Sequence, residues 1–255
     1  IVEQRIKEVI IRHKSLRWPV PSNLNMLLKG KKINGLLRRN KYLLLQFSVG
    51  TLIIHLGMSG KLRVVQQDTP FQKHDHIDFL FTHGVCLRFT DPRRFGAVLF
   101  TQSHWQEHAL LADIGPEPFS SDFNATYLWE LARGKKVAIK TFIMDGKTVA
   151  GVGNIYATES LFAAKINPLR AANTLTKPEA TLLVKEIRRV LERAIKKGGT
   201  TLNDFTQADG KPGYFSIELK AYGRGGLPCP RCKTTLKSVR INQRSTVYCQ
   251  HCQVG

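Results

Sequence analysis

The sequence contains few acidic side chains and no long hydrophobic segment. Its 19 Asp and Glu residues are set against 39 Lys and Arg residues, which gives the 255-residue chain a formal charge of +20 at pH 7. No run reaches the about 18 apolar residues of a membrane-spanning helix, and the most apolar stretch, Leu52 to Met58, is interrupted by His55. These features exclude a transmembrane helix and favour a polyanionic partner, most commonly nucleic acid. The charge also suits a basic protein kept soluble by repulsion, or one that binds ribosomes or membrane surfaces.

Cysteine is scarce and unevenly placed. Only five cysteines occur, and four of them lie beyond residue 228. This distribution favours a metal site in a reducing cytosol over a disulfide framework. Residues 1–20 lack the cationic, apolar and small-residue regions of a signal peptide, so secretion has no support and we expect a cytoplasmic protein.

The first part of the chain, residues 1–115, is rich in short apolar segments punctuated by glycines. We expect strands over 42–47, 51–56, 61–65, 76–81, 85–90 and 97–101. This pattern is typical of a meander folded as a sandwich or barrel. The proline-rich residues 116–120 then interrupt the pattern, and we interpret them as a hinge between domains.

From residue 121 the apolar residues recur with a helical period, so we expect a helical domain over 121–220. Ser121 or Asp122 can cap its first helix. Thr176 and Glu179 have the spacing of a capping box at the start of the last helix. The expected helices run through 127–131, over 154–164 and over 177–197.

The last part, residues 221–255, contains two Cys-x-x-Cys knuckles. Each knuckle turns two thiolates toward one point, and two knuckles complete a tetrahedral metal site. The predicted ligands of one structural zinc ion are Cys229, Cys232, Cys249 and Cys252. A thioredoxin-like redox pair is the competing interpretation, but that motif occurs once rather than in duplicate. Cys86 is expected in the core and His251 on the surface.

Between the knuckles, residues 237–248 alternate apolar and polar side chains. We expect a two-stranded ribbon that carries Arg240 and Arg244 near its turn. Such a finger can place an arginine against phosphates in a groove. The alternative is that both arginines are solvated surface residues.

Several motifs together resemble the bacterial formamidopyrimidine-DNA glycosylases, base-excision enzymes for oxidised purines. The motifs occur in the family's order along essentially the whole chain. They are residues 41–45, 55–60, 73–76, 91–96, 151–157, 198–201 and 209–215, together with the four-Cys finger. The related oxidised-pyrimidine glycosylases share the finger and the helical domain but do not usually carry the segment at 91–96, so we favour purine lesions.

The resemblance implies an α+β multidomain fold. An N-terminal β-sandwich is followed by a helical domain with a helix–two-turn–helix motif and by the zinc finger. It also implies DNA repair by a bifunctional glycosylase and AP lyase acting on duplex DNA that carries 8-oxoguanine, a formamidopyrimidine or an abasic site. The damaged nucleotide is flipped out, an amine attacks its sugar to form a Schiff base, and eliminations at both phosphates follow.

The resemblance implies that the sequence starts about one helix late, at residues that normally follow the family's N-terminal helix. Family members begin with Pro-Glu, which supplies the amine nucleophile and an acid/base group, whereas this sequence begins with Ile1. We therefore expect the printed chain to lack glycosylase activity.

The resemblance assigns roles to individual residues. Lys41 and Arg244 are implied to assist the eliminations, and Met58, Arg93 and Phe95 to fill the space that the flipped nucleotide leaves. The implied phosphate contacts are His74, Lys136 and Asn154.

Each assignment has a simpler alternative from the residues alone. Met58 and Phe95 would more often be core residues, and Lys41 a strand-edge lysine that blocks pairing. His74 and Lys136 would usually be solvated. Asn154 follows two glycines at a helix start, where backbone N–H groups can meet an anion, but this motif is weak by itself.

Residues 207–220 resemble the loop that closes over the flipped base. We expect a monomer that binds damaged duplex DNA and no membrane. Two alternatives stay open: a chain that binds damaged or abasic DNA without cutting it, and a zinc-ribbon RNA or ribosome binder. The RNA-binder hypothesis leaves the motifs at 91–96 and 151–154 unexplained.

Overall fold

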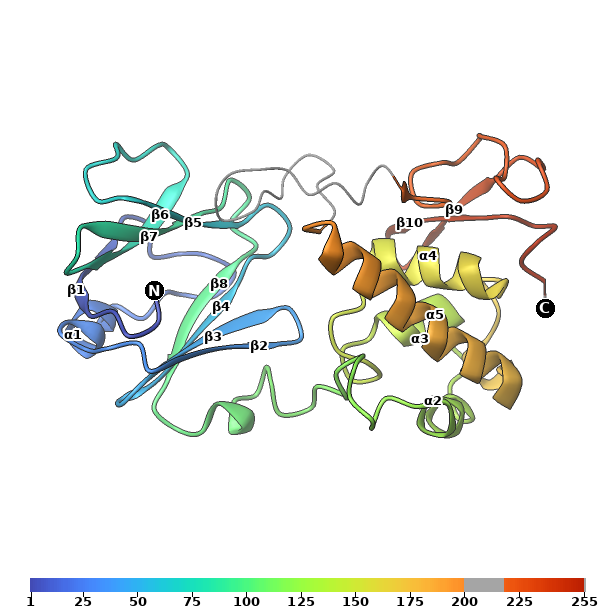
Figure 1. Ribbon diagram of the computed structural model, residues 1–255, viewed down its shortest axis with the longest axis horizontal. Coiled ribbons are helices and arrows are strands. Elements are labelled where there is room, and N and C mark those ends of the chain that lie inside the picture. Colours follow the sequence, from blue (N-terminus) through green and yellow to red (C-terminus); the bar gives the residue numbers. More distant parts are fainter. Residues whose placement is uncertain (200–217, 255) are drawn as a thin grey trace. The chain divides into compact units, whose positions relative to one another are not determined.

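The computed structural model describes residues 1–199 and 218–254, which form two compact units (Figure 1). The first unit contains residues 1–112, and the second contains 113–199 and 218–254. No helix in the described ranges is both long and apolar enough to cross a membrane. The finer domain bounds and the hinge at 116–120 stay predictions.

The first unit consists of two four-stranded antiparallel sheets with strand orders β1-β6-β7-β5 and β2-β3-β4-β8. The strands are β1 (Ile6–Ile11), β2 (Gly35–Arg39), β3 (Tyr42–Phe47), β4 (Gly50–His55), β5 (Lys61–Gln66), β6 (Asp75–Phe81), β7 (Val85–Thr90) and β8 (Ala97–Thr101). The helix α1 (Leu24–Leu28) and the 3-10 turn η1 (Trp105–Glu107) complete the described elements of this unit.

One hydrophobic core joins the two sheets. Phe79 and Phe89 from one sheet share it with Leu45, Leu52 and Val98 from the other, and all five are buried. This packing confirms the predicted β-sandwich. Cys86 is also buried, as predicted.

Four described elements of the first unit were not predicted from the sequence, namely β1, β2, α1 and η1. Strand β2 lies at the edge of its sheet and is largely exposed, so it lacks the alternation of apolar and polar residues by which half-buried strands are found. The helix α1 has only five residues, too few to show a helical period.

The second unit contains four α-helices around one core: α2 (Ala125–Ala132), α3 (Ile139–Met144), α4 (Asn154–Ala164) and α5 (Lys177–Lys196), with the 3-10 turn η2 (Ala172–Thr174). The expected capping box is present on α5. Glu179 N donates to Thr176 Oγ1 (3.4 Å), and Thr176 N donates to Glu179 Oε2 (2.9 Å). The first helix is capped by neither Ser121 nor Asp122. Asn124 is the cap, because its Oδ1 accepts a hydrogen bond from Tyr127 N (3.0 Å).

The finger forms the predicted two-stranded ribbon. Strand β9 (Lys237–Ile241) pairs antiparallel with β10 (Arg244–Tyr248). Asn242 and Gln243 both have a left-handed backbone (φ 46° and 62°), as a two-residue hairpin turn requires. Val247, Leu236 and two of the knuckle cysteines pack with Phe162 of α4, which ties the finger to the helices.

Candidate nucleic-acid interface

In the first unit, two loops are joined by the buried side chain of Asp91. Ser59 Oγ donates to Asp91 Oδ1 (2.7 Å) from the loop after β4, and Gly96 N donates to Asp91 Oδ2 (2.7 Å) from the loop after β7. Arg93 N also donates to Ser59 Oγ (3.3 Å). A fully buried carboxylate with these bonds fixes both loops in one arrangement.

Two glycines allow the loops to approach this closely. Gly57 has a left-handed backbone (φ +64°), and a Cβ there would lie 2.5 Å from the carbonyl carbon of Phe95. A Cβ on Gly96 would lie 2.7 Å from the carbonyl oxygen of His55. Larger residues would force the loops apart.

The joined loops hold three predicted gap-filling residues. Met58 is 49% exposed and Phe95 is 44% exposed, so neither is a core residue. The guanidinium carbon of Arg93 lies 4.7 Å from the centre of the Phe95 ring. A thioether, a cation and a flat ring are therefore presented to solvent on adjoining loops with a fixed backbone, an arrangement suited to insertion between bases.

His74 lies at a hollow beside the same loops. The cavity measures about 420 Å³ and is lined mainly by cationic and imidazole side chains, among them Arg12, His13, Lys73, His76 and Arg94. Asp91 N donates to the carbonyl oxygen of His74 (3.0 Å), and His76 Nε2 lies 2.8 Å from Asp91 O. Arg12 and His13 were not predicted from the sequence, because they come from the end of β1 and join this cluster only through the fold.

Lys41 is exposed in the turn between β2 and β3 rather than inside a strand. Its charge reaches the neighbouring imidazole of His55. Burial, followed by the charges of Lys41 and Arg17, lowers the pKa of His55. His55 Nδ1 accepts a hydrogen bond from Gly57 N (3.0 Å), which fixes the neutral tautomer in the loop that carries Met58.

In the second unit, the finger is attached to α3 and α4 by polar contacts around Ser245. Asn154, the first residue of α4, donates from Nδ2 to Ser245 O (3.2 Å). Lys140 of α3 donates to the same oxygen (3.0 Å) and to Thr246 Oγ1 (2.7 Å). These bonds place the exposed Arg244, which precedes Ser245, beside the start of α4.

Lys140 is buried to 1% exposure, and it was not predicted as a site residue. Burial, and then the nearby Arg244 guanidinium, lower the pKa of Lys140 to about 8. Its only sequence signal is a lone cation within the apolar stretch 137–143. The exposed Lys136 lies in the loop before α3, and no contact among the described residues joins it to Asn154 or Arg244.

The four knuckle cysteines are gathered at one point. Their Sγ atoms all lie within 4.8 Å of one another. A tetrahedral zinc ion with bonds of about 2.3 Å requires sulfurs about 3.8 Å apart, so the thiolates fit this ion. With four sulfur ligands the one structural zinc stabilises the finger and leaves no open position for substrate. His251, between the second pair, is exposed as predicted.

The predicted lesion-base loop, 207–220, lies outside the described residues except for 218–220.

Three family profiles match successive parts of the chain. The profile described as the formamidopyrimidine-DNA glycosylase N-terminal domain matches residues 1–98. The H2TH domain of the same family matches residues 114–206, and a zinc finger found in FPG and IleRS matches residues 226–254.

Whole-chain relatives agree with these matches. A formamidopyrimidine-DNA glycosylase of Vibrio atlanticus is 52% identical over 254 residues, which cover 100% of this chain and 94% of the relative. That of Idiomarina loihiensis is 54% identical over 97% of this chain and 92% of the relative. Among solved structures, a complex of Lactococcus lactis Fpg with DNA containing an abasic site has a TM-score of 0.90 at 35% identity, covering 99% of this chain and 93% of the other. Sequence and fold thus agree over almost the full length, and the chain belongs to the formamidopyrimidine-DNA glycosylase family.

Proposed function

We propose that this protein is a DNA repair glycosylase that removes oxidised purines from duplex DNA by flipping the damaged nucleotide. Family membership supports the reaction class. The observation that carries the proposal is the exposed group of Met58, Arg93 and Phe95 on two loops joined by Asp91. Exposing two large apolar side chains on a fixed backbone is unfavourable in water, but it prepares them to occupy a vacated base position.

The proposed roles follow from the chemistry of each side chain. Phe95 inserts at the base step, Met58 fills the volume that the extruded nucleotide leaves, and Arg93 forms hydrogen bonds to the orphaned base. His74, Lys136 and Asn154 contact phosphates and so position the duplex without reading its sequence.

We further propose that the protein is an AP lyase as well as a glycosylase. In this step an amine attacks the sugar carbon that bears the base, the base departs, and the resulting imine permits elimination at both flanking phosphates. Lys41 and Arg244 are the cations proposed to assist the eliminations. The contacts of Lys140 and Asn154 with Ser245 support the role of Arg244, because they hold the strand that carries it.

Borohydride trapping tests the glycosylase and lyase proposals together. Borohydride reduces the imine to a stable covalent adduct, so the active protein is expected to be trapped on a duplex that contains 8-oxoguanine. Replacing Phe95 by Ala is expected to lower adduct yield about fivefold or more, because a base–aromatic contact contributes ~1–3 kcal/mol. Met58→Ala is paired with Met26→Ala, which truncates an exposed methionine (73%) on α1 and is expected to have no effect. Equal yields from all these variants would contradict the proposed gap-filling role.

A second candidate is binding of damaged or abasic DNA without base release. The preparation used for trapping is first characterised by intact mass spectrometry. A sample of 28.8 kDa that binds an abasic duplex more tightly than an intact one, yet gives no adduct, would support the second candidate. Equal affinity for both duplexes would reject it.

The purine preference is tested by the same trapping assay with an oxidised-pyrimidine duplex. The cytoplasmic location and the monomeric state stay predictions.

A further inference from the structure

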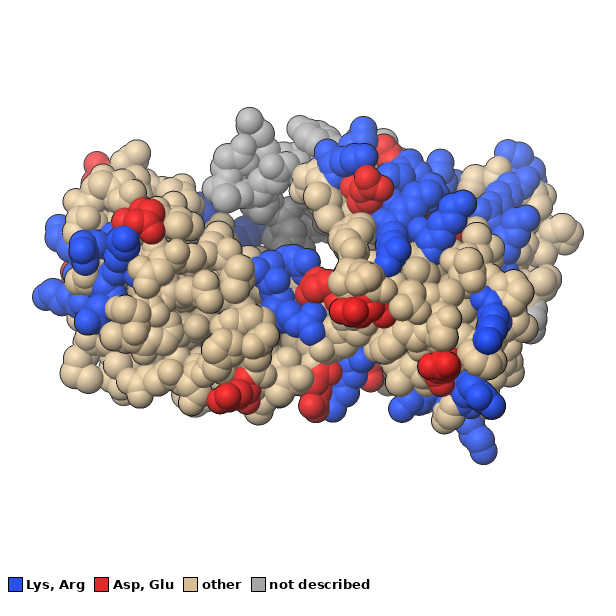
Figure 2. Space-filling view, turned by 60° about the horizontal axis from the view of Figure 1, so that its bottom comes forward, with Lys and Arg blue, Asp and Glu red and all other residues tan. Residues whose placement is uncertain are grey.

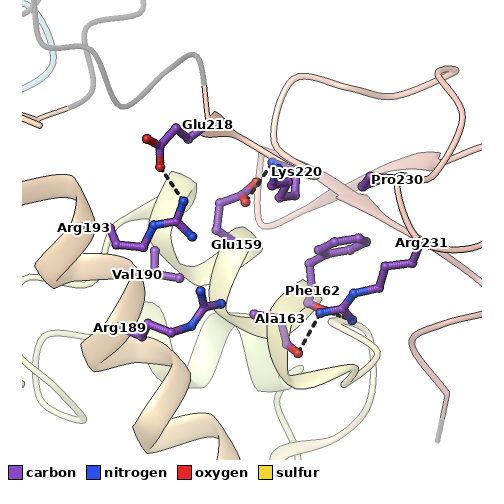
Figure 3. A pocket seen from close by; sticks show the side chains of 10 residues that line it. All are labelled: Glu159, Phe162, Ala163, Arg189, Val190, Arg193, Glu218, Lys220, Pro230 and Arg231. Carbon is purple, nitrogen blue, oxygen red and sulfur yellow. Dashed lines mark hydrogen bonds and ion pairs between the residues drawn. The ribbon is translucent and has the colours of Figure 1, made fainter.

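A pocket of about 220 Å³ lies in the second unit between α4, α5, the segment before the finger and the first cysteine knuckle (Figure 3). Its apolar lining comes from Phe162, Ala163, Val190 and Pro230. Of the residues to which a role in DNA repair has been assigned, only Glu218 and Lys220, at the end of the predicted lesion-base loop, line it.

Four cationic side chains surround this apolar lining: Arg189, Arg193, Lys220 and Arg231. Figure 3 shows that Arg189 and Arg193 project from α5, whereas Arg231 reaches across from the knuckle. At the right of Figure 2, the second unit bears a dense group of basic side chains with few acidic ones among them.

The acidic groups of the pocket are already occupied. The carboxylate of Glu159, which is 5% exposed, accepts hydrogen bonds from the backbone N–H groups of Lys220 (2.9 Å), Ala221 (2.9 Å) and Tyr222 (2.8 Å). Glu218 forms ion pairs with Arg193 (2.5 Å) and Lys197 (3.4 Å). Both acids therefore maintain the pocket and leave a surplus of positive charge.

The four cationic side chains differ in how many hydrogen bonds and ion pairs they form with protein groups. Arg231 donates to the carbonyl oxygens of Phe162 (2.9 Å) and Ala163 (3.1 Å) at the end of α4, so its role is structural. Arg189 Nε donates to Glu186 Oε2 (2.7 Å), three residues earlier on the same helix. Within the described ranges the Lys220 ammonium has no hydrogen-bond or ion-pair partner, although its backbone is held by Glu159. Lys220 is thus a pre-positioned cation at the rim of the pocket.

The position of the pocket argues against nucleic acid as its ligand. Glu159 to Ala163 lie roughly 8–14 Å along α4 from Asn154 at its start, at a rise of about 1.5 Å per residue. Arg231 lies in a knuckle, whereas Arg244 lies at the hairpin turn of the finger. A single carboxylate next to an apolar side chain meets complementary charge and an apolar surface.

We propose that this pocket binds a partner protein through an acidic peptide segment. Lys220 and Arg189 bind a carboxylate of the segment, and an adjoining apolar side chain packs against Ala163 and Pro230, the more exposed of the apolar lining residues. The inference goes beyond the proposed repair reaction and does not depend on it.

The test uses the zinc-loaded full chain and a fluorescein-labelled peptide of three aspartates followed by a C-terminal phenylalanine with a free carboxylate. Fluorescence anisotropy is expected to show saturable binding, weakened at least fivefold in Lys220→Gln and in Arg189→Gln. Lys177→Gln is the matched control, because Lys177 starts α5 about 18 Å from Arg189 along the helix. The control is expected to bind like the parent protein. Circular dichroism and zinc content confirm that the variants are folded.

Two further measurements identify the ligand class. A peptide with three asparagines and an amidated C-terminus is expected not to bind, and an undamaged DNA duplex is expected not to displace the acidic peptide. Absence of binding, an equal loss in Lys177→Gln, equal binding of the uncharged peptide, or displacement by the duplex would each overturn the proposal. Because none of these results involves adduct formation, failure here is distinguishable from failure of the glycosylase assignment.

Discussion

The buried Lys140 predicts a specific pH dependence of stability. In the folded protein its pKa is about 8, compared with 10.5 for an ordinary lysine. The folded state therefore binds fewer protons than the unfolded state between these values, so stability rises as the pH increases through this window. Replacing Lys140 by Met keeps an unbranched side chain of similar length but removes the titrating group, and with it this contribution.

The magnitude follows from the two pKa values. At pH 7 the ammonium is charged in both states, and its full burial penalty is present. At pH 9.5 the buried amine is largely neutral while the unfolded one is still mostly charged. The free energy of unfolding of the parent protein should therefore rise by about 2 kcal/mol relative to Lys140→Met between pH 7 and pH 9.5. The lost hydrogen bonds to Ser245 and Thr246 shift the variant's stability at all pH values but contribute little to this difference.

Chemical denaturation followed by circular dichroism at 222 nm is the appropriate assay. Apart from the five-residue α1, every described α-helix lies in the second unit, so the signal reports on the unit that contains Lys140. Lys185→Met, on the exposed surface of α5, is the control and should follow the parent protein across the range. If the stabilities of Lys140→Met and the parent protein stay parallel from pH 7 to 9.5, Lys140 is not the buried cation that the structure describes.

Three further predictions concern separate parts of the molecule. Gly96→Ala should lower the free energy of unfolding by ~1–3 kcal/mol in thermal melts, because its Cβ would lie 2.7 Å from His55 O, whereas Gly134→Ala, with nothing within 4 Å, should not. Chelation of zinc should unfold the finger and abolish binding of an abasic duplex while the β-sandwich signal persists; unchanged binding would contradict the role of Arg244. Hydrogen bonds, first from Arg170, lower the pKa of Glu179 to about 2. The ionised Glu179 therefore stabilises the folded state above pH 4.5, and this contribution to the free energy of unfolding is lost toward pH 2. The free energy of unfolding of Glu179→Gln, measured as the pH is lowered, should not show this loss.

The strands and helices with strong local signals were predictable from the sequence. The strands β3 to β8 and the helices α4 and α5 occur where periodicity and capping placed them. The four zinc ligands were equally accessible, because two Cys-x-x-Cys knuckles have few other uses. Where the local signal was weak, prediction failed: edge strand β2 is mostly exposed, and Asn124 rather than an earlier residue caps α2.

The sequence by itself determined the local elements with strong periodicity or capping, the zinc ligands, the basic charge and, through motifs in a fixed order, the family. Only the tertiary structure decided which side chains are exposed. Met58 and Phe95 point to solvent because Asp91 joins two loops that are distant in sequence. Lys140 is buried because the finger packs over α3. Burial depends on contacts between residues far apart in the chain, which no local pattern records.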